Sequence, residues 1–322
     1  MNRWVARVLL TICLLAAFLS AYILFPWPIP AAQSFELIAH RGVHQTFPLT
    51  NLKNDTCTAA IIDPPRHDYL ENTIPSMQTA FAAGATAVEL DIHRTSDNQL
   101  AVFHDWTLDC RTNGSGEVNA QPMAALRELD IAYGYTPDGG KSYPLRGSGV
   151  GLMKTLPEIL AAFPDKHFII HDKDGDPATA ALLAAFLQPL SPAQRALLSY
   201  WGSDEGLKIV RTQAPEVTPY IYDAQSLRSC QGDYLLRMLL TGSLPARCQQ
   251  QVIGIPYRML ATLPGWPNLI LARAHQAGAR VYITDVDSAA ELETLASLPI
   301  DGIQTNRIEE IGPLLTNRVA PD

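Results

Sequence analysis

Four short apolar runs within the first 173 residues of the 322-residue sequence end in a histidine or a charged residue. The ends read His40-Arg41-Gly42, Glu89-Leu90-Asp91, His104-Asp105 and His171-Asp172-Lys173. A single end of this kind would indicate little. Parallel barrel strands, however, all point their carboxyl ends at one mouth. The four ends therefore predict one shared site.

The residue types in this set suit the cleavage of a phosphodiester. Glu89 and Asp91 are two positions apart on a strand, so both carboxylates face the same side. Such paired oxygen ligands favour Mg²⁺ or Ca²⁺ over zinc. His40 and His104 suit acid–base chemistry near neutral pH.

Two cations complete the set. Arg41 offers a planar fork to phosphate oxygens, and Lys173 adds a point charge for the same purpose. Phosphodiester cleavage requires charge neutralisation, a base for the attacking oxygen and an acid for the leaving group. The site therefore predicts a small phosphodiester substrate.

The elements that must position these residues alternate between strand and helix, which predicts a parallel sheet with helices outside. Strands are expected at 35–39, 87–92, 100–103, 168–171, 196–200, 218–222, 252–255, 280–284 and 302–305. Helices are expected at 73–83, 156–163, 178–187, 204–211, 268–277 and 289–296. The length suits one TIM-type (β/α)8 barrel. Nine strands are one too many, so one is expected to be a loop or an extra edge.

Two long segments without this rhythm, Val43–Leu70 and Asp105–Val150, directly follow the first and third predicted strands. A barrel places its active-site loops at such positions. Long irregular loops in compact domains are usually functional or disordered. We expect both segments to form walls of the substrate cleft.

Composition limits the class of partner. A hydrophobic share of 47% is enough for a large core, and the net charge is −8 with the basic residues scattered. Nucleic-acid binding would need a basic patch, so it is not expected. In a net-acidic protein, an attraction for phosphate has to be local and is typically helped by a metal ion.

The N-terminus predicts membrane attachment. Arg3 and Arg7 precede an apolar run, Val8–Phe25, which has about the length of a membrane span. Prolines follow the run where a cleavage site needs small residues, which favours an uncleaved signal anchor over a cleaved signal peptide. The arginines keep the N-terminus cytoplasmic. This predicts a single-pass inner-membrane protein with an anchor and linker over 1–33 and the barrel over 34–322 on the periplasmic or extracytoplasmic side.

Four cysteines lie outside the apolar run, and four cysteines allow three pairings. We expect Cys230–Cys248, which closes a short loop, and Cys57–Cys110, which joins the two long segments. The alternative is four unrelated buried thiols. An oxidising compartment favours the disulfides.

The motifs together resemble the glycerophosphodiester phosphodiesterase family. The resemblance is dense from Phe35 to Val118 and recurs to Arg307. It is carried by Ile38-Ala39-His40-Arg41-Gly42, Glu71-Asn72-Thr73, Val88-Glu89-Leu90-Asp91, Val102-Phe103-His104-Asp105, Cys110-Arg111-Thr112-Asn113-Gly114-Ser115-Gly116 and, more loosely, Val281-Tyr282-Ile283-Thr284 and Asp301-Gly302-Ile303-Gln304-Thr305-Asn306-Arg307.

The resemblance implies a TIM barrel, one divalent metal ion, and hydrolysis of a glycerophosphodiester to glycerol 3-phosphate and an alcohol. It makes His40 and His104 the acid–base pair, Glu89 and Asp91 metal ligands, and Arg41 a phosphate contact. Glu71 is expected to support Arg41 or the metal, although Glu-Asn-Thr also suits an ordinary helix start.

Two departures from the family pattern stand out. The family usually has Glu-x-Lys on the fourth strand, and here the position of the glutamate is His171. Strand alternation places His171 and Lys173 on one face, whereas a bulge could turn Asp172 inward instead. The segment between Arg41 and Glu71 is also longer than usual. Its polar residues are expected to be solvated: His44, Asp55, Asp63, His67 and Asp68.

Two other functions stay open. The membrane anchor fits a phosphodiesterase that acts on lysophospholipid or sphingolipid head groups. The loss of the expected glutamate fits a catalytically silent barrel that binds a phospho-ligand, since a fold alone does not determine function.

Overall fold

The computed structural model describes residues 3–32, 34–49, 52–53, 56–221, 243–244, 249 and 251–319. Its strands are β1 (Glu36–His40), β2 (Ala87–Arg94), β3 (Leu100–Val102), β4 (His167–Asp172), β5 (Leu198–Trp201), β6 (Thr218–Ile221), β7 (Val252–Pro256), β8 (Arg280–Thr284) and β9 (Gly302–Thr305). Its α-helices are α1 (Arg3–Leu24), α2 (Ile74–Ala82), α3 (Met123–Arg127), α4 (Leu156–Ala162), α5 (Pro177–Leu187), α6 (Pro192–Arg195), α7 (Asp204–Gln213), α9 (Asn268–Gln276), α10 (Ala289–Leu295) and α11 (Ile308–Val319). Short 3₁₀ helices lie at Thr58–Ile61, Val118–Ala120 and Tyr257–Thr262.

Hydrogen bonds join the strands in the order β1-β9-β8-β7-β6-β5-β4-β2-β3, and β1 also pairs with β2. The eight strands other than β3 therefore close into a parallel barrel, as the sequence predicts. β3 pairs antiparallel with β2, with Ile92 opposite Val102. It is the extra edge that the count of nine strands implied.

The predicted elements all appear with small shifts of their ends. The strand predicted at 218–222 ends at Ile221, and Tyr222 lies outside the described residues. The helix α11 was not predicted. It contains Pro313, a residue that removes a backbone hydrogen bond and usually interrupts helices.

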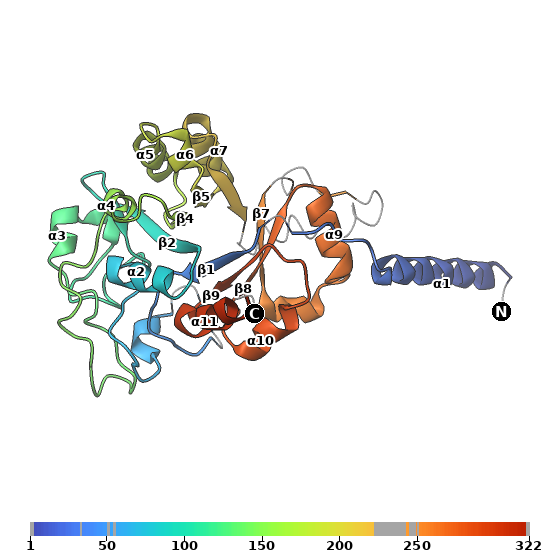
Figure 1. Cartoon of the computed structure of the whole chain (residues 1–322), viewed down its shortest axis with the longest axis horizontal. Coiled ribbons are helices and arrows are strands. Elements are labelled where there is room, and N and C mark those ends of the chain that lie inside the picture. The colour runs from blue at the N-terminus through green and yellow to red at the C-terminus, as the bar shows by residue number, and fades with distance from the viewer. Residues whose placement is uncertain are drawn as a thin grey trace. The chain divides into compact units, whose positions relative to one another are not determined.

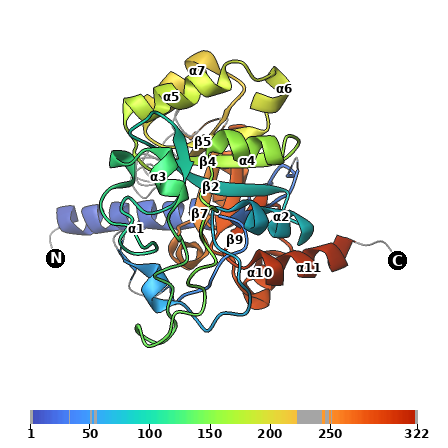
Figure 2. The same cartoon turned by 90° about the vertical axis from the view of Figure 1, so that its left-hand side faces the viewer.

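The described residues group into two compact units. One comprises Met1–Phe35, Ile221–Asp285 and Glu293–Ile303, and the other comprises Glu36–Tyr220, Val286–Leu292 and Gln304–Asp322. In the second unit α5 packs against α7, and both lie beside β4 and β5 (Figure 1, Figure 2). This unit holds every predicted site residue.

The two long segments of the second unit share one hydrophobic cluster. Ala59, Ile62 and Leu70 pack there with residues of the 105–150 segment such as Leu108 and Tyr135. A disulfide joins Cys57 to Cys110, as predicted. Cys230 and Cys248 lie outside the described residues, so their pairing stays a prediction.

Among the described residues, one helix is long and apolar enough to cross a membrane. It is α1, with 22 residues, a mean hydropathy of 2.2 and no buried residue. Among the described residues of its unit, α1 contacts α9 near the C-terminal end of α1 (Figure 1). There Arg273 donates a hydrogen bond to Tyr22 Oη (3.1 Å).

Candidate active site

The strand register brings the predicted site residues together. His40, the last residue of β1, lies opposite Glu89 of β2, and Asp91 of β2 lies opposite His171 of β4. His104 lies just after β3. Phe103, which stands between β3 and His104, donates its N–H to Asp91 O (3.1 Å). All of these side chains therefore start from adjacent strands of one sheet.

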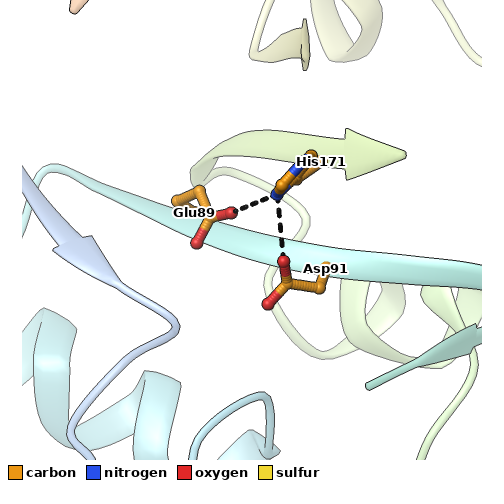
Figure 3. Close-up of side chains that lie close together, drawn as sticks. All are labelled: Glu89, Asp91 and His171. Atoms are coloured by element: carbon orange, nitrogen blue, oxygen red, sulfur yellow. Dashed lines mark ion pairs between the residues drawn. The ribbon is translucent and has the colours of Figure 1, made fainter. Parts of the chain in front are cut away.

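Glu89, Asp91 and His171 form a group that could hold a metal ion. One ligand atom from each lies within 4.8 Å of the others. In Figure 3, His171 from β4 points its nitrogen at both carboxylates of β2. His171 Nδ1 lies 3.0 Å from Asp91 Oδ1 and 3.5 Å from Glu89 Oε1. Two hard oxygen donors and one imidazole suit a divalent cation.

The carboxylates of this group have the properties expected of metal ligands. Both oxygens of Glu89 and Oδ1 of Asp91 are buried and accept no hydrogen bond from the described residues. Buried polar atoms normally find a partner, so these atoms fit the metal that the family resemblance implies. Burial and the nearby Asp91 carboxylate raise the pKa of Glu89. The pKa of Asp91 is held well below its usual value by Arg41 and Lys173, against the effect of burial.

Asp172 lies outside this group. Its Oδ2 accepts a hydrogen bond from Tyr200 Oη (2.8 Å), and its Oδ1 accepts one from Gly175 N (3.1 Å). No bulge turns it inward, and β4 stays in register with β2 through Asp172. The ring of His171 stacks on Trp201 with centroids 3.5 Å apart, which fixes the plane of the imidazole.

Arg41 reaches two carboxylates from a strained backbone position. Its φ is +61°, a conformation that is uncommon outside glycine and found often at functional sites. Arg41 Nη1 donates to Glu71 Oε1 (3.2 Å), and Nε lies 3.2 Å from Asp91 Oδ2. Gly42 follows with φ +84°, and a Cβ there would collide with Ser76. This collision explains the glycine of the His-Arg-Gly motif.

A hydrogen-bond relay orients His40. His40 Nδ1 contacts Asn306 Oδ1 (2.6 Å), and Asn306 Nδ2 donates to Asp287 Oδ2 (2.8 Å). Because Asp287 takes the amide N–H, Asn306 turns its oxygen to His40, whose Nδ1 must then carry the proton. Nε2 is left free, 3.7 Å from Glu89 Oε2. Burial and the positive charge of Arg41 lower the pKa of His40 well below 6.5.

A carboxylate orients His104 in the same way. His104 Nδ1 donates to Asp105 Oδ1 (2.6 Å), so Nε2 carries no proton and accepts a hydrogen bond from Lys173 Nζ (3.2 Å). Burial and Arg41 lower the pKa of His104 to about 4. Burial also lowers the pKa of Lys173. Both imidazoles thus present an unprotonated Nε2 close to the group of Glu89, Asp91 and His171.

The sequence did not single out several supporting residues. Asn72 Nδ2 donates to Asp91 Oδ2 (2.9 Å), and its Oδ1 accepts from Asp91 N (3.2 Å). The available signal for a role in the site was membership of the motifs that carry the family resemblance, which include Asn72, Asn306 and Arg111. Asp287 had none, because nothing in its neighbourhood indicates a contact with Asn306.

The long segment after β1 differs from the solvated loop that was expected. His44 is 1% exposed, so the prediction for it was wrong: its Nδ1 donates to Gln45 O (2.8 Å). Asp63 accepts from Thr46 (2.6 Å), Asp68 is exposed, and Asp55 lies outside the described residues. Beside Asn306 is a pocket of about 270 Å³, lined by His44, Thr46, Phe47, Leu49, Asp287, Ser288, Glu291, Asn306 and Arg307. The segment does wall a cavity next to His40.

Known proteins resemble this chain in sequence and in fold. Residues 40–310 match the model of the glycerophosphoryl diester phosphodiesterase family. A glycerophosphodiester phosphodiesterase of Bacillus subtilis is 30% identical over 251 residues, which cover 73% of this chain and 78% of the relative.

Two solved structures have a similar fold. One is the glycerophosphoryl diester phosphodiesterase domain of an uncharacterized Mycobacterium tuberculosis protein, with a TM-score of 0.63 at 16% identity, over 88% of this chain and 100% of that one. The other is a glycerophosphodiester phosphodiesterase from Agrobacterium tumefaciens, with a TM-score of 0.59 at 22% identity, over 87% and 99%. At these sequence identities the two structures support the barrel fold and nothing beyond it. The family match and the Bacillus relative show more: the chain belongs to the glycerophosphodiester phosphodiesterase family of enzymes.

Proposed function

We propose that this enzyme hydrolyses glycerophosphodiesters to glycerol 3-phosphate and an alcohol, with one divalent ion, Ca²⁺ or Mg²⁺, and with His40 and His104 as the acid–base pair. One observation carries the proposal. Both imidazoles have Nδ1 engaged, by Asn306 and by Asp105, and present an unprotonated Nε2 at the site that holds the buried Glu89 and Asp91 carboxylates.

Two imidazoles that present their Nε2 atoms to one site can exchange protons with both the attacking and the leaving oxygen of a displacement. One of the two histidines first takes up a proton from water at Nε2. The substrate's own glycerol hydroxyl then attacks phosphorus and gives its proton to the neutral imidazole, while the protonated one gives its Nε2 proton to the departing alcohol. Water then opens the resulting cyclic phosphate with the two roles reversed. Each histidine returns to its starting protonation state, so the cycle is balanced.

The charged residues hold the phosphate in place. Glu89, Asp91 and His171 would hold the ion, which supplies positive charge to the phosphate oxygens when bound. Arg41 offers its guanidinium to the same oxygens, and Lys173 adds a second positive charge beside His104 Nε2. Glu71 orients Arg41 through the bond to Nη1.

The test is release of glycerol 3-phosphate from glycerophosphocholine and glycerophosphoethanolamine by the full chain in detergent. Ca²⁺, Mg²⁺ and EDTA are compared, and His40→Ala is run beside the wild type. Metal-dependent release that disappears in His40→Ala supports the proposal. If the folded protein releases nothing with any metal, the proposal is wrong, and binding of a radiolabelled diester without turnover would identify a silent phospho-ligand-binding barrel.

The helix α1 favours a second candidate substrate class, lysophospholipid or sphingolipid head groups. We propose that α1 is an uncleaved signal anchor, with anchor and linker over 1–33 and the barrel over 34–322 on the periplasmic or extracytoplasmic face of an inner membrane. Its length and exposure support this, as does the Cys57–Cys110 disulfide, which suits an oxidising compartment. Phosphocholine or choline release from lysophosphatidylcholine micelles, above that from glycerophosphocholine, would identify the lipid activity. N-terminal sequencing of the membrane-bound protein tests the anchor.

A further inference from the structure

Arg111 is buried below the candidate active site and fully engaged there. Its side chain is 2% exposed. Nε donates to Asp105 Oδ2 (2.9 Å), and Nη1 donates to Glu71 Oε2 (3.1 Å). Nη1 also donates to Tyr135 Oη (2.7 Å), and Nη2 donates to Thr58 Oγ1 (2.8 Å). One guanidinium thus joins two carboxylates that belong to different segments of the chain.

Each of those carboxylates orients a different part of the site. The other oxygen of Asp105 accepts from His104 Nδ1 (2.6 Å), and the other oxygen of Glu71 accepts from Arg41 Nη1 (3.2 Å). Arg111 therefore lies behind both the imidazole and the phosphate-binding guanidinium. It lowers the pKa of Asp105 and of Glu71 against the effect of their burial, so both stay anionic acceptors.

The surroundings of Arg111 fix it from several directions. Its neighbour Cys110 forms the disulfide with Cys57, and Thr58, next to Cys57, accepts the hydrogen bond from Arg111 Nη2. Gly134 N donates to Arg111 O (3.1 Å). A Cβ on Gly134 would collide with the Cys110 carbonyl, so glycine permits the close approach that brings Tyr135 to the guanidinium.

We propose that Arg111 is a positioning residue that aligns His104 and Arg41 together, and that the Cys57–Cys110 disulfide and Thr58 hold it in place. This rests on the proposed function of His104 and Arg41. The segment after β1 then supports the active site in addition to walling the pocket. A lysine cannot replace the arginine, because one ammonium cannot present the planar fork that reaches both carboxylates.

The test compares Arg111→Lys with Arg195→Lys in the full chain in detergent. Arg195 also makes four hydrogen bonds, two to Glu216 and two to backbone carbonyls, but touches no site residue. Arg111→Lys is expected to lower kcat roughly 10- to 100-fold, the usual effect of losing an orienting partner, and to raise KM through Arg41. Arg195→Lys is expected to leave both within twofold.

A double-mutant cycle separates positioning from general destabilisation. If Arg111 acts through Asp105, Arg111→Lys adds little to the loss in Asp105→Asn. Independent losses, or a folded Arg111→Lys with kcat within twofold of the wild type, would overturn the inference. Because the chain has eight histidines, ¹⁵N-histidine NMR also reports directly on His104. Its Nδ1–H signal, assigned with His104→Gln, should weaken in Arg111→Lys and not in Arg195→Lys.

The NMR reading distinguishes the two proposals. If His104 changes its tautomer in Arg111→Lys while no diester is cleaved by the wild type, the proposed function fails and the positioning role stands. Two milder changes keep the test independent of the folding of Arg111→Lys: Thr58→Val, and removal of the Cys57–Cys110 disulfide by replacing both cysteines with serine. Each is expected to lower kcat several-fold and to weaken the same signal. An unchanged kcat and signal in both would overturn the inference.

Discussion

Replacing Asn306 with alanine tests the relay that sets the tautomer of His40. The amide oxygen accepts the Nδ1–H of His40 at 2.6 Å, and Asp287 prevents the amide from turning over. Without this acceptor the half-buried Nδ1–H loses its partner, at a cost of about 1 to 2 kcal/mol. That energy is the preference for the tautomer with a free Nε2. At 1.36 kcal/mol per factor of ten, kcat is expected to fall about 5- to 30-fold.

Two measurements follow this prediction. Steady-state release of glycerol 3-phosphate gives kcat, and ¹⁵N-histidine NMR of the wild type and Asn306→Ala gives the proton position on His40. The matched control is Asn113→Ala, because Asn113 Oδ1 also accepts a hydrogen bond, from Asp130 N at 2.8 Å, but contacts no histidine. A folded Asn306→Ala with wild-type kcat and an unchanged His40 tautomer would refute the reasoning.

Three further predictions concern the metal group, the first compact unit and the His-Arg-Gly turn. His171→Ala removes one of the three proposed ligands, so Ca²⁺ affinity measured by calorimetry should fall roughly 10- to 100-fold; equal affinity would mean that the ion binds elsewhere. The hydrogen bond to Asp301 raises the pKa of His275 above 6.5 in the folded state. The stabilisation of the fold by protonated His275 is therefore complete below pH 6.5 and is lost as the pH rises through the raised pKa. The difference in melting temperature between the wild type and His275→Gln should accordingly narrow from pH 6 to pH 9, and a difference that widens would contradict the raised pKa. Gly42→Ala forces a Cβ against Ser76 in a left-handed backbone and should lower the free energy of unfolding by about 1 to 3 kcal/mol in urea titrations, whereas a neutral change would show that Ser76 can move away.

Strand ends could be predicted from the sequence because their signal is local. An apolar run followed by His40 or by His104 indicates both the strand and the edge at which its side chain lies. Strand alternation likewise favoured His171 over Asp172, and the structure places His171 with the carboxylates. The disulfide between Cys57 and Cys110 was also expected.

Long-range partners could not be predicted in the same way. Asn306 is 266 positions from His40, and no periodicity links the two. Arg111 has an ordinary type and spacing, and its role follows from the fold that brings Asp105 and Glu71 to one guanidinium. His44 was predicted to be solvated because it stands in an irregular segment, but the hydrophobic cluster below that segment gives the loop a core of its own. Burial in long loops depends on such packing, which sequence pattern does not report.

The charges of the site imply that ion and substrate bind cooperatively. The connected side chains comprise four carboxylates, Glu71, Glu89, Asp91 and Asp105, and three cations, Arg41, Arg111 and Lys173. With neutral imidazoles the site carries one excess negative charge, which repels a phosphodiester monoanion. A divalent ion reverses that sign, and the diester then neutralises it, so each ligand should favour the other by the same factor. Calcium titrations of His40→Ala, which should bind the diester without cleaving it, are expected to show about 5-fold or greater tightening with glycerophosphocholine present. Equal calcium affinity with and without the diester would mean that the phosphate does not bind near the charged side chains of this group. Salt screens buried charges only weakly, so a phosphate bound beside them would have to change the calcium affinity.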